Sequence, residues 1–212
     1  MYYSQFEQDK FLNENIFKDF KDGFFVDIGA YDGKTQGSNS LFFEELGWDG
    51  ICVEPNPSLY KKLVKNRKCK CVDYAISDSQ GEAQFLYIKE GIGRPDTLGG
   101  LTENWKKEDV DKLISDFRLD ETEGLYEYIN VKTELFENIV DRQTIQYLSL
   151  DVEGNELKIL NTIDFDRFDI WVMSIENNSA DNQISNFFKD KPYTHVSNLG
   201  CDEIYIKNTL IV

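Results

Sequence analysis

Short apolar runs alternate with amphipathic stretches along most of the chain, and acids or glycines follow many of the apolar runs. Apolar runs of about four to eight residues are typical of buried strands. This pattern predicts strands at residues 24–28, 50–54, 70–72, 83–88, 145–150, 170–175, 193–196 and 203–206. Strands that alternate with helices favour a parallel sheet covered by helices on both faces. The sequence therefore predicts an α/β domain.

Helices are predicted between these strands by apolar residues spaced three or four positions apart. The expected helices cover residues 4–20, 40–46, 57–66, 155–163 and 184–188. Ser4 and Glu7 have the spacing of a capping box, so the first helix is expected to begin there. Asn56 precedes Pro57, a favourable N-cap followed by proline at the first helical position.

The segment 89–130 departs from this regular pattern. It begins with closely spaced glycines, then becomes strongly acidic, and carries Val110, Leu113, Ile114 and Phe117 at helical spacing. Long insertions in compact domains are more often binding loops than inert connections, so we expect a lid here. The alternative is a variable surface excursion. The chain shows no internal repeat or domain linker, and residues 1–212 are expected to form a single domain.

The acidic composition of the chain restricts its partners. Its 212 residues include 39 acidic and 23 basic side chains, which give a net charge of −16. Such a surface repels phosphate backbones and anionic lipid, so neither nucleic acid nor a membrane surface is expected as a partner. No signal peptide or membrane-spanning run is evident, so membrane insertion is not expected. The four cysteines form no CxxC pair, and reduced thiols in a cytoplasmic compartment are expected.

Four acids lie at or just beyond the ends of predicted strands: Asp27, Glu54, Asp151 and Glu176. Any one of them can be explained as the N-cap of the following helix. The carboxyl ends of parallel strands, however, meet at one edge of the sheet, where ligands bind in such folds. Four acids at this edge therefore predict a binding site.

The glycine-bounded turn after the first strand favours a cationic or hydroxyl-rich ligand. Asp27 and Asp32 are expected to face this ligand, and two carboxylates would repel a pyrophosphate. They suit the amino acid and ribose of S-adenosylmethionine. Glu54 lies 27 residues beyond Asp27, a little past the spacing at which an acid binds ribose hydroxyls in a βαβ unit.

Five motifs occupy these strand ends: VDIGAYDG (26–33), SN (38–39), GWDGICVEPNP (47–57), LSLDVEGNELKIL (148–160) and SIEN (174–177). Together with residues 3–9 and 192–206, they resemble the FkbM-type S-adenosylmethionine-dependent methyltransferases. The resemblance implies the class I methyltransferase fold, a Rossmann-like three-layer sandwich with a mostly parallel seven-stranded sheet and an antiparallel last strand. It also implies O-methylation, commonly of hydroxyls on sugars, glycans or polyketide-type products. A carbohydrate or other polyol is therefore the expected acceptor.

The resemblance also assigns residues to the cofactor, S-adenosylmethionine. Asp27 and the glycine turn are expected to hold its methionine half, Glu54 its ribose, and Asp73 its adenine. The full set implied by the matching motifs is Asp27, Gly29, Ala30, Tyr31, Gly33, Ser38, Glu54, Asn56, Asp73, Ala75 and Asp151.

An alcohol is a poor nucleophile, and a positioned base accelerates its reaction by about 10²–10⁴-fold. Candidate catalytic residues are Asp151, Glu153, Glu176 and His195. His195 is the only histidine, and its ordinary pKa suits base catalysis near neutral pH. It can equally be an outward-facing strand residue, so Asp151 and Glu176 rank above it.

Metal binding is an alternative role for the same acids. Asp151, Glu176 and Asn177 offer oxygen ligands of the kind that Mg²⁺ and Mn²⁺ prefer. This layout is similar to that of the catechol-type methyltransferases, which have a lysine where Gly154 stands here.

Two further functions compete with methyl transfer. The first is a non-catalytic glycan- or cofactor-binding module, for which the chain can be one domain of a larger glycan-assembly enzyme. A nucleotide-dependent oxidoreductase would also use Glu54 for a ribose, but the segment from Gly29 to Gly33 is not a GxGxxG motif.

Overall fold

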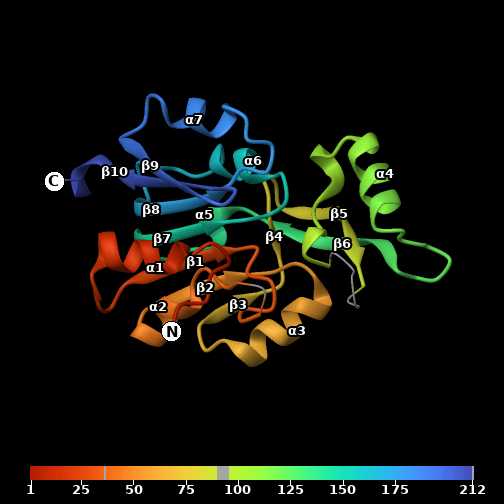
Figure 1. Ribbon diagram of the computed structural model, residues 1–212, viewed down its shortest axis with the longest axis horizontal. Coiled ribbons are helices and arrows are strands. Elements are labelled where there is room, and N and C mark those ends of the chain that lie inside the picture. The colour runs from red at the N-terminus through yellow and green to blue at the C-terminus, as the bar shows by residue number, and fades with distance from the viewer. Residues whose placement is uncertain (36, 90–95, 212) are drawn as a thin grey trace.

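The computed structural model describes residues 1–35, 37–89 and 96–211 (Figure 1). Within these residues the main sheet has seven strands in the order β3-β2-β1-β7-β8-β10-β9. They are β1 (Phe24–Ile28), β2 (Asp49–Val53), β3 (Lys70–Val72), β7 (Thr144–Leu150), β8 (Asp169–Glu176), β9 (Tyr193–Leu199) and β10 (Asp202–Lys207). Strand β10 runs antiparallel to both β8 and β9, and the other neighbouring pairs are parallel. The predicted fold class is confirmed.

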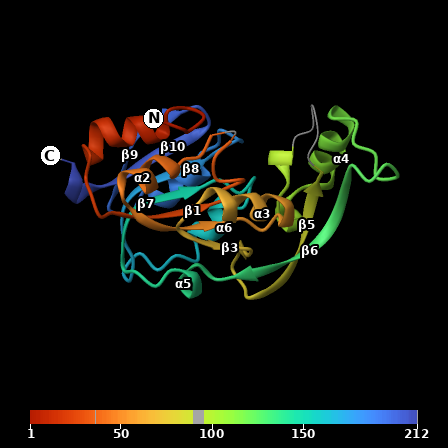
Figure 2. The same ribbon diagram turned by 90° about the horizontal axis from the view of Figure 1, so that it is seen from below.

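Helices cover both faces of the main sheet. They are α1 (Gln8–Leu12), α2 (Leu41–Leu46), α3 (Pro57–Asn66), α5 (Phe136–Ile139), α6 (Glu156–Leu160) and α7 (Gln183–Phe188). Side chains alternate across a strand, so Phe25 packs with α1 to α3 while Val26 packs with α5 to α7. Figure 2 shows α1 and α5 on opposite sides of the sheet. By the same alternation, Asp27 shares the α1–α3 face with Phe25.

A second, three-stranded sheet lies beside the main one. Its strands are β4 (Ala75–Ile76), β5 (Gly81–Ile88) and β6 (Tyr126–Glu134), in the order β4-β6-β5. The strand expected at 83–88 therefore belongs to this sheet. Strand β6 was not predicted because most of its side chains are exposed or half-buried, so it has no continuous apolar run. Figures 1 and 2 both show β5, β6 and α4 extending to one side of the main sheet.

The predicted insertion at 89–130 contains helix α4 (Lys107–Asp116) between β5 and β6. Val110 of this helix is buried against Leu86 and Ile88 of β5, as its spacing predicts. Short 3₁₀ turns precede the helix at Asp96–Leu98 and Thr102–Asn104, and another follows β10 at Asn208–Leu210. The glycines at 91 and 93 lie outside the described residues.

The N-terminal helix is shorter than predicted, and its capping box is wrong. Helix α1 begins at Gln8 and continues as a π-helix at Asn13–Phe17. Glu7 has a left-handed backbone (φ 60°), and its carboxylate pairs with Lys10 at 3.0 Å. Ser4 Oγ instead accepts a hydrogen bond from the backbone N–H of Asp9 (3.0 Å). The carboxylate of Asp9 also accepts from Tyr3 N (2.6 Å) and from Ser4 N (3.4 Å), and the second of these bonds is the one expected for Glu7.

The ends of the next two helices agree with the sequence. Helix α2 ends at Gly47, whose φ of 106° is a left-handed conformation that glycine adopts without strain. Asn56 Oδ1 accepts hydrogen bonds from Ser58 N (3.0 Å) and Leu59 N (3.3 Å), which satisfies the first free N–H groups of α3. No helix of the described residues is both long and apolar enough to span a membrane.

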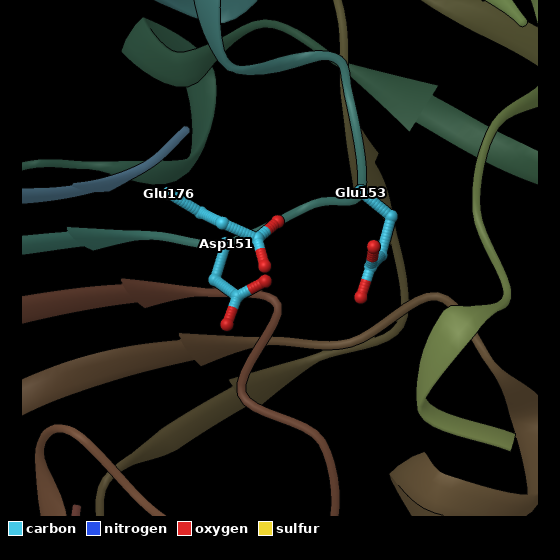
Figure 3. Close-up of side chains that lie close together, drawn as sticks. All are labelled: Asp151, Glu153 and Glu176. Atoms are coloured by element: carbon cyan, nitrogen blue, oxygen red, sulfur yellow. The ribbon is translucent and has the colours of Figure 1, made fainter. Parts of the chain in front are cut away.

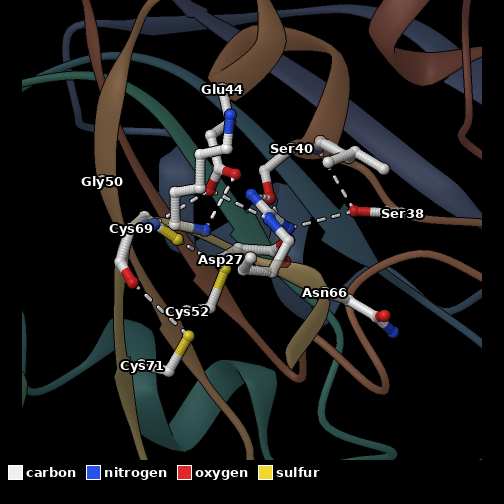
Figure 4. A network of polar contacts seen from close by, with 12 residues as sticks. Asp27, Ser38, Ser40, Glu44, Gly50, Cys52, Asn66, Cys69 and Cys71 are labelled. Atoms are coloured by element: carbon white, nitrogen blue, oxygen red, sulfur yellow. Dashed lines mark hydrogen bonds and ion pairs between the residues drawn. The ribbon is translucent and has the colours of Figure 1, made fainter. Parts of the chain in front are cut away.

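A buried guanidinium group connects the end of α3 to α2 and, through a serine, to the end of β1. Arg67 donates to Glu44 Oε2 (3.1 Å), Ser38 Oγ (3.3 Å) and Ser40 Oγ (3.0 Å), and its side chain is 0% exposed. Ser40 Oγ in turn donates to Asp27 Oδ2. Figure 4 shows Glu44, Ser38, Ser40 and Asp27 gathered in this network.

Replacing Arg67 with methionine should lower the free energy of unfolding by about 3 kcal/mol or more. The aliphatic stem is kept, but Glu44 and Asp27 lose their buried cation. Urea unfolding checks this value. Arg142→Met is the matched control, because its pair with Asp49 is exposed and is expected to contribute less than about 1 kcal/mol. Equal losses in the two variants would contradict a structural role for the buried network.

Candidate functional site

A cavity of about 430 Å³ opens at the carboxyl ends of β1, β2, β7 and β8. It brings together most of the residues that the sequence assigns to a site. Those that line it are Asp27, Gly29, Ala30, Tyr31, Ser38, Glu54, Asn56, Ala75, Asp151, Glu153 and Glu176. Gly33, Asp73 and His195 are not among the described residues that line the cavity.

The floor of the cavity is a close contact between the turn after β1 and the loop after β7. Gly29 has φ +86°, and a Cβ there would lie 1.6 Å from the Asp151 carbonyl oxygen. The N–H groups of Gly29 and Ala30 donate to Val53 O (3.0 Å each), and Asp151 N donates to Ile28 O (3.0 Å). Only glycine fits this position, because every other residue adds an atom where the neighbouring backbone lies.

Asp27 and Asp32 have different surroundings. Asp27 is buried and accepts from Ser40, and burial raises the pKa of its carboxyl group despite the nearby Arg67. Asp32 was expected to face the ligand, but it closes its own turn by accepting from Lys34 N (2.9 Å) and Thr35 N (2.7 Å). That expectation is wrong, because the backbone donors of the turn surround this carboxylate.

Gly33 and Asp73, to which the motifs assign cofactor contacts, also lie outside the described cavity lining. A Cβ at Gly33 would lie 2.5 Å from Leu63 Cδ1, so this glycine allows the turn to pack on α3. Asp73 is exposed just beyond β3.

Glu54 connects the loops that follow β1 and β2. Its two carboxylate oxygens accept from Tyr31 N (3.0 Å) and Asn56 N (2.8 Å). Burial raises the pKa of Glu54 to about 8, and these backbone bonds oppose the shift. Beside it, the buried Nδ2 of Asn56 has no hydrogen-bond partner among the described residues. A hydrogen-bond acceptor of a ligand would satisfy this amide.

The wall next to Glu54 is apolar. Its side chains come from the loop between β2 and α3, from α3 and from the second sheet: Pro55, Leu59, Ala75, Ile76 and Phe85. Such a surface suits a flat, weakly polar ring more than a charged group.

Three carboxylates form the opposite end of the cavity. One ligand oxygen each from Asp151, Glu153 and Glu176 lies within 4.8 Å of the others. Figure 3 shows the carboxyl groups of Asp151 and Glu176 next to each other, with that of Glu153 beside them. Burial, followed by the charges of neighbouring acids, raises the pKa of Glu153 and of Glu176 to about 8. Burial and the Glu176 charge raise the pKa of Asp151 well above its usual range.

The membership of this cluster differs from the set inferred from the sequence. Asn177 was expected to join Asp151 and Glu176, but its amide donates to Asp181 O (2.9 Å) and Glu203 Oε1 (2.6 Å). Glu153 occupies the third position because its backbone is left-handed (φ 58°) and the loop turns back toward β8.

Two residues that hold this loop were missed by sequence reasoning. Glu156 accepts from Val152 N (3.0 Å) and Gly154 N (3.1 Å), and Trp105 Nε1 donates to Glu153 O (2.7 Å). The second glutamate of the DVEGNE motif was a usable signal for Glu156. Nothing near Trp105 in the sequence indicates its contact, because 48 residues separate it from Glu153.

A second, shallower groove of about 840 Å³ adjoins the acid cluster. It shares Leu98, Glu153 and Asn178 with the first cavity. Trp105 lines it together with mostly polar side chains, namely Lys106, Asp109, Lys158, Asn161, Ser179, Asp181 and Gln183. The acid cluster therefore lies where two open spaces meet.

Residues 27–193 match the sequence family described as the methyltransferase FkbM domain. The chain belongs to this family. Membership supports a methyltransferase, and S-adenosylmethionine is the general methyl donor that such a domain suggests. No curated protein sequence matches the chain significantly.

The FkbM fold is also found among solved structures. The chain is similar to the crystal structure of methyltransferase FkbM from Methylobacillus flagellatus KT, with a TM-score of 0.50 and 12% identity. The alignment covers 88% of this chain and 44% of that chain, so the FkbM domain described here spans less than half of its length. At this identity the likeness shows the fold alone.

His195 lies away from the site in this FkbM domain. It is exposed on β9, its Nε2 lies 2.8 Å from Asn198 Oδ1, and its ring packs 5.3 Å from that of Tyr205. The geometry therefore favours the acids over His195 for any role at the cavity.

The raised pKa values predict that the FkbM domain loses stability as the pH rises. In the unfolded chain Glu54, Glu153 and Glu176 have the ordinary pKa of 4.5, and in the folded protein about 8. Between these values the folded state binds more protons, so stability is present at lower pH and is lost as pH rises through 8. Urea unfolding at about pH 6 and about pH 9, with a chelator present, should show a decrease of a few kcal/mol.

Glu54→Gln should make this pH dependence shallower, because one of the shifted groups no longer titrates. Glu137→Gln is the control, since Glu137 is exposed and pairs with Arg167 at the surface. A free energy of unfolding that stays constant or rises over this range in the wild type would contradict the shifts.

Proposed function

We propose that this chain is an S-adenosylmethionine-dependent O-methyltransferase that acts on a hydroxyl of a sugar or glycan. The observation that carries the proposal is the continuity of the cavity. One end presents the Gly29 turn, Glu54 and an apolar wall, and the other presents three carboxylates beside an open groove. Cofactor and acceptor can therefore approach the same point from two sides.

The first end fits S-adenosylmethionine. The Glu54 oxygens, each of which has a second lone pair, can accept the two ribose hydroxyls, and the unpartnered Nδ2 of Asn56 can donate beside them. The apolar wall suits adenine. Gly29 leaves the floor free of side-chain atoms, and the carboxylates of the cavity suit a positively charged ligand.

S-adenosylmethionine supplies a methyl group on a positively charged sulfur, and the protein supplies alignment and a proton acceptor. Glu153 is the best-placed acceptor because it lines both the cavity and the groove. Its pKa of about 8 lies near neutral pH, where a carboxylate can take the proton of an acceptor hydroxyl while the new bond forms. Asp151 and Glu176 then hold the hydroxyl or neighbouring polar groups.

The groove supports a polyol as the acceptor. It combines an indole ring with amide, hydroxyl and charged side chains, and orientation in such sites depends on a few polar groups around an apolar surface. The segment that carries Trp105 comes from the insertion at 89–130, so we propose that this insertion covers the acceptor.

Above about pH 8, where Glu54 is ionised, Glu54→Ala should weaken binding of S-adenosylhomocysteine by about 2–4 kcal/mol, because the variant loses paired hydrogen bonds to a charged group. Isothermal titration calorimetry measures the affinity. Glu82→Ala is the control, since Glu82 is exposed on β5 and absent from the described cavity lining. Unchanged affinity in Glu54→Ala would exclude the ribose assignment, and stabilisation by NADH in place of S-adenosylhomocysteine would favour an oxidoreductase.

Trp105→Ala should raise the KM for a glycan acceptor on the order of tenfold while leaving the affinity for S-adenosylhomocysteine unchanged. Loss of a ring contact accounts for about 1 kcal/mol of this change. A panel of glycans with labelled S-adenosylmethionine identifies the acceptor first. Trp105→Phe keeps a ring but removes the bond to Glu153 O, so it separates contact with the acceptor from positioning of Glu153. An unchanged KM in both variants would remove the groove from the proposal.

A further inference from the structure

We propose that Asp151, Glu153 and Glu176 bind one hard divalent cation, Mg²⁺ or Mn²⁺, where the cavity meets the groove. The proposal does not depend on methyl transfer, because ion binding can be tested directly. It is argued from the missing hydrogen-bond partner of Glu176, the spacing of the three carboxylates and the metals that carboxylate oxygens prefer. With the ion bound all three carboxylates are ligands, so the role of proton acceptor proposed for Glu153 applies to the metal-free protein.

The first observation is an unsatisfied oxygen. Glu176 is only 7% exposed, and its Oε2 is a buried atom without a hydrogen-bond partner among the described residues. Figure 3 shows this side chain directed at Asp151, which is itself an acceptor when ionised. A buried carboxylate oxygen without a donor is unfavourable, so it indicates that another group belongs there.

Other buried acids of this chain have donors. Glu54 accepts from two backbone N–H groups, Glu156 accepts from Val152 N and Gly154 N, and Asp202 accepts from Ser174 Oγ (2.7 Å) and Gln8 Nε2 (3.0 Å). By contrast, no ion pair between described residues involves the three carboxylates of the cluster. The donors that the cluster does have are Asn178 Nδ2, which donates to Glu153 Oε2 (3.3 Å), and the weakly donating Cys201 thiol, 3.9 Å from Glu176 Oε1. Glu176 Oε2 is left without a donor among the described residues.

The spacing fits a single ion. Mg²⁺ binds oxygen at about 2.0–2.1 Å and Ca²⁺ at about 2.3–2.6 Å, so two ligands on opposite sides of one ion are about 4–5 Å apart. The three ligand oxygens of the cluster lie within 4.8 Å of one another. Adjacent ligands of a six-coordinate Mg²⁺ lie about 3 Å apart, so side-chain movement from this spacing would complete the site around the smaller ion.

The ligand chemistry selects the class of metal. All three ligands are carboxylate oxygens, with no imidazole in the set, which favours Mg²⁺, Mn²⁺ or Ca²⁺ over zinc or copper. Three protein ligands also leave positions free on a six-coordinate ion. These positions face the cavity and the groove, both of which Glu153 lines.

The loop that carries two of the ligands is already held in shape. Asp151 N donates to Ile28 O, Glu156 fixes the N–H groups around the turn, and Trp105 holds the Glu153 carbonyl. The principal alternative occupant is a proton shared by Asp151 and Glu176. Such a proton would neutralise one of the two charges and leave Glu153 unaffected.

The test is a calorimetric and EPR titration of the full chain with MnCl₂ in about 0.15 M NaCl, where exposed charges are screened. Wild type is expected to bind one Mn²⁺, with competition by Mg²⁺. Glu176→Gln and Asp151→Asn should weaken binding at least tenfold, and Glu137→Gln should leave it unchanged. Thermal unfolding without metal should show that Glu176→Gln is no less stable than wild type, because the substitution removes a repelling charge.

Two results would overturn the proposal. Equal Mn²⁺ binding in wild type and all three variants would mean that the ion responds to the overall charge of −16. No Mn²⁺ binding by the folded wild type would mean that the carboxylates share a proton. Specific binding of Ca²⁺ alone would retain the site but reject the assignment to Mg²⁺ or Mn²⁺.

Discussion

The site depends on one close approach of backbone to backbone, where the turn at Gly29 lies against the carbonyl of Asp151. A single Cβ atom at Gly29 would lie 1.6 Å from that oxygen, so the two loops can meet only because the side chain is missing. The contact joins the ends of β1 and β7, and the bonds from Gly29 and Ala30 to Val53 O add the end of β2. Three strand ends are thus fixed relative to one another, and the acids that follow them converge on one cavity.

The buried carboxyl groups at the two ends of this cavity have different hydrogen-bond partners. At Glu54, backbone N–H groups meet both oxygens, so the carboxylate is supported by the protein itself. At Glu176, one oxygen has no such donor among the described residues, and the other lies 3.9 Å from the weakly donating Cys201 thiol. Asp27, which also lines the cavity, is supported by Ser40 and the buried Arg67. The two ends therefore differ in the hydrogen-bond donors that they offer to a glutamate side chain.

Local sequence patterns predict local structure well in this protein. The cap of α3 by Asn56, the end of α2 at Gly47 and the buried strands of the main sheet follow from side-chain chemistry and from runs of apolar residues. Strand β6 escapes prediction because only two of its side chains are buried, and a strand exposed in this way has no hydrophobic signature. The capping box fails because Glu7 has a left-handed backbone and pairs with Lys10, while the carboxylate of Asp9 accepts the Ser4 N–H expected for Glu7.

The candidate site was partly predictable for the same reason. Acids at strand ends are visible in sequence, so Glu54, Asp151 and Glu176 were found. Asp32 instead accepts from the backbone of its own turn, and the Asn177 amide donates to Asp181 O. Both bonds depend on which donors and acceptors lie nearby in space. Trp105 reaches Glu153 across a long stretch of chain, a contact that only the assembled second sheet creates. Residue type gave the chemistry, and the fold determined which groups meet.

The bridge that Glu54 makes between Tyr31 N and Asn56 N has a consequence for the energetics of recognition. Both loops are already held by one carboxylate, so a ligand that enters does not have to restrict two freely moving segments. Little conformational entropy is then lost on association, and more of the contact energy remains as affinity. Such a preorganised entrance also limits how far the surrounding backbone can adapt, which favours discrimination by shape over tolerance of varied ligands.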